Sequence, residues 1–201
     1  MQMRIHLAAC LMTAALLSAA MQNAEPALAQ ASNKPLPVVE KPAPPEKNPP
    51  GDIPDDQVFI EYRSPQGFSM QVPEGWARKD GGDSVSFSDK YNTIEVAVTS
   101  DLTQPTIASV KQAQVSTLES GGRAVKITQV KTTKLPAGET VSIAFGSNSE
   151  PNPVTNKAIR LENERYFFWK DGKLATLTLS APFGADNADQ WQLMSRSFRW
   201  Q

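Results

Sequence analysis

The clearest structural signal in the sequence reads AIRLENERYFFWKDGKLATLTLSA, from Ala158 to Ala181. Two long segments flank Asp171-Gly172, a dipeptide that type I′ hairpin turns prefer. In the second segment apolar residues alternate with threonine and serine, which is the period of a strand with one buried face. This stretch therefore predicts a hairpin of two long antiparallel strands.

Shorter segments with strand-like patterns precede this hairpin. The predicted strands cover residues 59–62, 68–72, 85–87, 94–98, 123–133 and 139–145. Residues 105–118 change to a helical period, and Gly121-Gly122 ends the predicted helix. A last helix is expected from Asn187, a favourable N-cap, to Phe198. The order of strands, helix, long strands and helix predicts an α+β fold in which helices pack on an antiparallel sheet.

The N-terminal residues 1–29 have the layout of a secretory signal peptide. Arg4 is followed by an almost uninterrupted apolar run and then by Ala27-Leu28-Ala29, whose small residues predict cleavage after Ala29, with a site nearer Ala20 as the alternative. The apolar run is shorter than the roughly 20 residues of a spanning helix, so we expect no integral membrane span after cleavage. Leu7-Ala-Ala-Cys10 looks like a lipobox, but most of the apolar run follows Cys10, which favours a chance match.

Residues 30–56 hold half of the 16 prolines of the chain and no aromatic residue. Proline fixes φ and removes the amide donor, so this stretch is not expected to form helices or sheet ladders. It is predicted to be a disordered proline-rich linker, either a spacer or a simple leader. The globular domain is then expected to cover residues 57–201.

Composition excludes several functions. The formal net charge of -1 gives no overall field that would attract nucleic acid. The single histidine and the single cysteine, His6 and Cys10, both lie in the predicted signal peptide. The mature domain therefore has no Ser-His-Asp or Cys-His arrangement and no zinc or copper site of the usual type, and we expect neither metal nor cofactor.

Two enzymatic routes remain: a pair of carboxylates acting as acid and base, and a serine or threonine activated by lysine. Glu162 and Glu164 are two positions apart on a predicted strand and would share one face, and Glu139 is a further candidate acid. Such residues are more commonly part of a solvated strand face.

Several segments resemble PsbP-like domains. They are Phe59-Ile-Glu-Tyr62, Gly67-Phe-Ser-Met70, Val72-Pro-Glu-Gly-Trp76, Arg165-Tyr-Phe-Phe-Trp169 and Ser197-Phe-Arg-Trp200. The resemblance covers nearly all of residues 57–201 and implies a central antiparallel sheet sandwiched by helices. It also implies a non-enzymatic role, because PsbP-like relatives, among them a lumenal photosystem II subunit, a nuclear-import regulator and bacterial envelope proteins, mostly bind other proteins. The histidines attributed to metal binding in the photosystem subunit have no counterpart here, so no manganese role is implied.

Tyr166 and Phe168 are the candidate protein-binding residues. They share one strand face, and a sheet covered on its other side only would expose them as a binding patch, whereas a sandwich would place them in the core. The sequence thus predicts an exported, non-enzymatic binding or accessory protein of the periplasm or cell envelope, whose partner is another envelope protein. The alternatives are a photosystem-associated lumenal subunit, a carboxylate-dependent hydrolase and a ligand carrier with an apolar pocket.

Overall fold

The computed structural model of the chain describes residues 40–201. The predicted signal peptide, its cleavage sites, the lipobox-like Cys10 and the first part of the proline-rich segment lie outside the described residues. Within residues 40–201, no helix has the length and apolar composition that crossing a bilayer requires.

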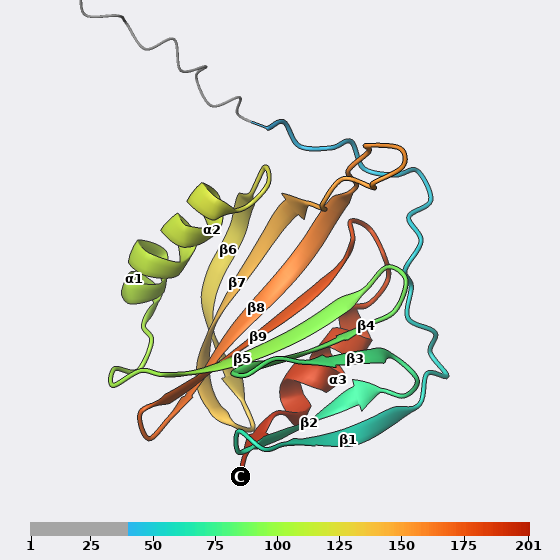
Figure 1. The fold of residues 1–201 in the computed structure, drawn as a ribbon. Helices are drawn as coiled ribbons and strands as arrows, with labels where there is room; N and C mark the ends of the chain where they lie inside the picture. Colours follow the sequence, from blue (N-terminus) through green and yellow to red (C-terminus); the bar gives the residue numbers. More distant parts are fainter. Residues whose placement is uncertain (1–39) are drawn as a thin grey trace, which may run out of the picture. The chain divides into compact units, whose positions relative to one another are not determined.

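Two antiparallel sheets form the body of the domain (Figure 1). The large sheet has the strand order β3 (Ala77–Asp80), β4 (Ser84–Ser88), β5 (Thr93–Ser100), β9 (Lys173–Pro182), β8 (Arg160–Lys170), β7 (Gly138–Asn148) and β6 (Lys126–Leu135). The small sheet has the order β1 (Phe59–Ser64), β2 (Phe68–Pro73) and β10 (Arg199–Trp200).

The predicted hairpin is the β8–β9 pair, and its strands lie near the middle of the large sheet. Asp171 and Gly172 have φ values of 49° and 78°, the positive angles that a type I′ turn requires at both central positions. Phe168 faces Ala175 across the pair, so the register places the aromatic residues of β8 beside the small and branched residues of β9. The hairpin prediction is therefore confirmed.

Helical segments cover both faces of the large sheet. The first consists of α1 (Ile107–Val110), a π-helical turn (Lys111–Val115) and α2 (Ser116–Gly121), and begins with a capping box between Thr106 and Ser109. The second is α3 (Ala188–Ser197). Figure 1 shows α1 and α2 beside β6 and β7, and α3 on the side of β1 and β2.

Each face of the large sheet has its own core. On the α3 face, Phe168 stacks on Phe198 with ring centroids 4.1 Å apart, next to Met194 of α3 and Phe68 of β2. On the other face, Val110 of the first helical segment packs with Ile143, Phe145 and Phe167 of β7 and β8. The predicted α+β sandwich is thus the observed fold.

The proline-rich residues 40–56, here called the strap, lie against the domain. They contain neither helix nor strand, but Ile53 is 3% exposed and belongs to the larger core. The domain therefore begins before residue 57, where the sequence analysis placed the boundary. Proline prevents regular ladders, but the remaining N–H and C=O groups of the strap are free to bond to side chains of the domain.

Candidate binding groove

A trough runs along β7 on the face of the large sheet that α3 covers. Side chains at every second position of a strand share one face, and on this face of β7 they are small or polar: Ala144, Gly146 and Asn148. Gly146 lies in register between Lys126 of β6 and Glu162 of β8. The long side chains of Lys126 and Glu162 therefore lie on either side of a glycine, which leaves a depression between them.

A cavity of about 500 Å³ lies over this trough, a volume within the usual range of ligand pockets. Its apolar walls come from three elements: Pro42, Ala43 and Pro45 of the strap, the loop residue Phe183, and Trp191 of α3. Its charged residues are Lys126, Arg160, Glu162 and Glu164. We call this cavity the β7 groove.

A second cavity of about 340 Å³ lies between α3 and β6. Glu164 and Trp191 line both cavities, so the two are neighbours that share these side chains.

The two carboxylates of the β7 groove differ in their surroundings. Burial raises the pKa of Glu162, the nearby charge of Glu164 adds to this, and the backbone N–H of Gly184 acts in the opposite direction by donating to the carboxylate. Glu164 accepts a hydrogen bond from the Tyr166 hydroxyl, whose own pKa is raised first by burial and then by this bond. Within the described residues 40–201, neither carboxylate forms an ion pair.

Arg160 closes the end of the trough at which β7 finishes. Its guanidinium lies so close over Gly146 that a Cβ atom there would collide with it. It donates to the carbonyl of Ala124 at 2.8 Å and to Oδ1 of Asn148 at 3.2 Å, and burial lowers its pKa. Any larger residue at position 146 would therefore force the Arg160 side chain to move.

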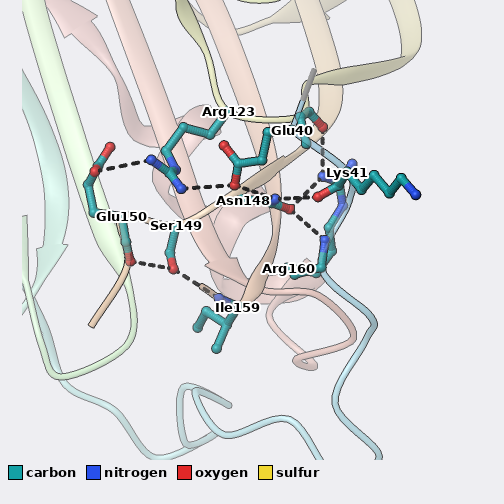
Figure 2. A network of polar contacts seen from close by, with 10 residues as sticks. Glu40, Lys41, Arg123, Asn148, Ser149, Glu150, Ile159 and Arg160 are labelled. Atoms are coloured by element: carbon teal, nitrogen blue, oxygen red, sulfur yellow. Dashed lines mark hydrogen bonds and ion pairs between the residues drawn. The ribbon is translucent and has the colours of Figure 1, made fainter. Parts of the chain in front are cut away.

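Asn148 anchors the upstream end of the strap (Figure 2). Its Oδ1 accepts the N–H of Ala43 at 2.9 Å, and its Nδ2 donates to the carbonyl of Lys41 at 2.9 Å and to Oε1 of Glu40 at 2.8 Å. Arg123 holds the same Glu40 carboxylate at 2.9 Å. We call Asn148 together with Arg123 the Asn148 clamp.

Asn187 anchors the downstream end with the same pattern of bonds. Its Oδ1 accepts the N–H of Ile53 at 2.7 Å, and its Nδ2 donates to the carbonyl of Gly51 at 3.0 Å. Asn187 does occupy the N-cap position of α3, as its sequence context predicts, but its side chain makes no capping hydrogen bond. Between the two anchors, residues 44–48 are exposed.

The predicted binding residues Tyr166 and Phe168 lie in the larger core. They are 7% and 1% exposed, and their rings stack with centroids 6.2 Å apart. The structure thereby corrects the expectation of an exposed aromatic patch, because α3 and Phe198 cover this face of the sheet. Tyr166 also lines the second cavity, and its hydroxyl donates to Glu164 of the β7 groove.

The candidate acids are placed differently from one another. Glu162 and Glu164 both line the β7 groove, side by side on one strand face, whereas Glu139 is an exposed residue at the start of β7. The two groove carboxylates therefore do not face each other from opposite walls.

Sequence reasoning missed the groove itself and the bonds by which the two asparagines hold the strap. The one available signal was Gly146 in the interior of a strand, since such a glycine often marks a close approach of another group.

No family model and no curated protein matches the sequence. Solved structures do match in fold. The cyanobacterial PsbP (CyanoP) of Synechocystis sp. PCC 6803 is 14% identical, with a TM-score of 0.53 over 75% of this chain and 98% of that one. The Ran-binding protein Mog1p of Saccharomyces cerevisiae is 13% identical, with a TM-score of 0.49 over 71% of this chain and 95% of that one. The likeness to the cyanobacterial structure, together with the helix-covered antiparallel sheet, shows that this chain contains a domain with the PsbP-like fold.

Proposed function

We propose that the protein is an exported, non-enzymatic accessory protein of the periplasm or cell envelope, and that it binds a segment of another protein in the β7 groove. The observation that carries this proposal is the groove of about 500 Å³ with apolar walls and two carboxylates that have no ion-pair partner in residues 40–201. The signal-peptide layout of residues 1–29 supports export. The resemblance to PsbP-like domains supports a binding role over a catalytic one.

The groove provides two kinds of interaction for a partner. Phe183 lines the groove and is 45% exposed, so covering it with a partner removes apolar surface from water. A lysine or arginine of the partner would pair with Glu162 and Glu164, whose charges are otherwise only hydrogen-bonded. An extended segment with a basic side chain among apolar ones therefore fits the groove.

Affinity capture with matched baits tests the proposal. The tagged mature protein, residues 30–201, is incubated with the envelope and periplasmic fractions, and bound proteins are quantified by mass spectrometry. Phe183→Ser removes an exposed apolar wall, and Ala144→Phe fills the floor of the trough. Leu102→Ser is the control, because Leu102 is 92% exposed and is not a lining residue of the groove.

The expected result is a protein that the wild type and Leu102→Ser retain and that both groove variants lose. Circular dichroism and thermal melting verify that the variants are folded. A protein retained equally by all four baits would place binding on another surface. A capture without any enriched protein would reject the protein-binding role and shift weight to a small-molecule or cell-wall ligand, or to the hydrolase alternative.

A further inference from the structure

Both anchors of the strap recognise its main chain with one pattern of hydrogen bonds. Each asparagine donates to the carbonyl of one strap residue and accepts the N–H of the residue two positions later: Lys41 and Ala43 at Asn148, Gly51 and Ile53 at Asn187. Residues i and i+2 of an extended chain present their polar groups on the same side, so any extended peptide offers this pair. At Asn148 the pattern does not depend on the side chains of the strap, whereas at Asn187 it includes Gly51, whose φ of 105° favours glycine.

The two anchors differ in what else holds the strap. At the downstream anchor the Ile53 side chain is buried in the core, Gln190 donates to the Ile53 carbonyl, and Asp52 accepts the N–H of Asp186. At the upstream anchor Lys41 and Pro42 are exposed, so the clamp holds this end through main-chain hydrogen bonds and through Glu40. The upstream end is therefore the one that can leave while the downstream end stays in place.

Charge and proline spacing define what the Asn148 clamp accepts. The side chains of Arg123 and Glu40 are each about one-third exposed (33% and 35%), so the ion pair contributes specificity more than stability. Pro42 and Pro44 restrict the residues that precede them, Lys41 and Ala43, to extended conformations. A segment of this kind loses little conformational entropy when it docks.

We propose that the Asn148 clamp is a binding site for an extended segment of the partner, and that residues 40–43 of the strap fill it when the partner is absent. The matching segment carries an acidic residue, a proline two positions later, and a free N–H on the residue after the proline. This inference rests on the proposed function, because Pro42, Ala43 and Pro45 also form a wall of the β7 groove. When the partner displaces the upstream end of the strap, the groove widens next to the clamp.

The strap then acts as an intramolecular competitor. The apparent affinity for the partner is reduced by the fraction of chains in which the clamp is free. If the strap fills the clamp in nine chains of ten, releasing it strengthens binding about 10-fold.

A labelled peptide with the sequence of residues 40–46, Glu-Lys-Pro-Ala-Pro-Pro-Glu, is the probe. Its binding to the mature chain is followed by fluorescence polarisation. The strap-release variant combines Glu40→Ala with Ala43→Pro, which removes the carboxylate and the N–H that the clamp binds and leaves residues 57–201 unchanged. We expect this variant to bind the peptide at least about 10-fold more tightly than the wild type.

Two further changes locate the binding at the clamp. Asn148→Asp in the release variant keeps the size of the side chain but removes its N–H donor, and should abolish binding. Two altered peptides, one with proline in place of its alanine and one with glutamine in place of its first glutamate, test the same contacts without changing the protein. The first should not bind, and the second should bind several-fold more weakly. In the NMR spectrum, the side-chain NH₂ signal of Asn148 should shift when the unaltered peptide is added.

Equal peptide binding by the wild type and the release variant, or no binding to either, would overturn the clamp proposal. The same peptide added to the capture experiment separates this proposal from the proposed function. If the partner depends on Phe183 but the peptide does not bind, the groove function stands and the clamp fails. If the peptide binds through Asn148 but capture is indifferent to Phe183→Ser, the clamp stands and the groove function fails.

Discussion

At the scale of single residues, Gly146 combines with Arg160 to form the end of the trough. A methyl group on residue 146 would displace the guanidinium and break its bonds to Ala124 and Asn148. We expect Gly146→Ala to lower the free energy of unfolding by about 1–3 kcal/mol, the usual cost of overpacking. Urea denaturation measures this. Gly82→Ala is the control, since no atom lies within 4 Å of a Cβ at that position. Its cost in unfolding free energy should stay within about 0.5 kcal/mol. Equal losses of stability in both variants would contradict the packing role of Gly146.

Glu162 gives a residue-scale prediction about pH. Because burial raises its pKa in the folded protein, ionisation of this carboxyl costs the folded state free energy. The cost is absent below the unfolded pKa, where the group is protonated in both states, and is complete above the folded pKa. Glu162→Gln should therefore gain stability relative to the wild type as the pH rises from about 3 to 7.

Urea titrations at a series of pH values measure this difference, and terms common to both proteins cancel. Since Glu162 is only half-buried, the gain is a fraction of what a deeply buried carboxylate would give. Glu74→Gln, at an exposed position, controls for the loss of one charge. A difference that falls with rising pH would show that the folded state favours the ionised form.

At the scale of elements, the strap is part of the folded domain through Ile53. We expect Ile53→Ala to lower the free energy of unfolding by about 2–5 kcal/mol, as other large-to-alanine changes in cores do. Val58→Ala, at a residue that is 57% exposed just before β1, should have little effect. Chemical denaturation of both variants decides the matter. A neutral Ile53→Ala would mean that residues 40–56 behave as the independent linker that the sequence predicts.

The elements that the sequence predicts well are those with a local signal. Alternation in β9 and the Asp171-Gly172 turn mark the central hairpin, and strand parity separates Phe167 from Phe168 correctly. The edge strand β3 was missed because all four of its residues are exposed and show no alternation. β10 was also missed, because a strand of two residues has no periodic pattern and is defined only by its pairing with β2.

The strap and its anchors were missed for a different reason. Asn148 bonds to a residue 105 positions earlier in the sequence, and Asn187 to one 134 positions earlier. A proline-rich composition indicates only that regular helix and sheet hydrogen bonds are absent. It does not predict hydrogen bonds to side chains that are distant in the sequence. Tyr166 and Phe168 illustrate the same limit, since their burial depends on α3, which follows them.

At the scale of the whole molecule, the strap joins the end of β7 to the start of α3. A chain that begins at residue 57 lacks the strap that both anchors bind, whereas one that begins at residue 47 keeps the contacts of Gly51 and Ile53 with Asn187. We expect the midpoints of urea unfolding to rank residues 57–201 lowest, 47–201 higher and 30–201 highest. The larger step should lie between the first two, because Ile53 contributes more than the exposed upstream anchor. Equal midpoints would contradict a stabilising role for the strap.

The strap also has a place in the order in which the chain is made. Synthesis builds a polypeptide from its N-terminus, so residues 40–56 are made long before Asn148 and Asn187, the residues that bind them. The strap is therefore made first but cannot dock until β7 and α3 have been made. Until β7 and α3 have folded, the strap is free to bind a chaperone or a receptor. Its docking on Asn148 and Asn187 therefore requires that both of these elements are already in place.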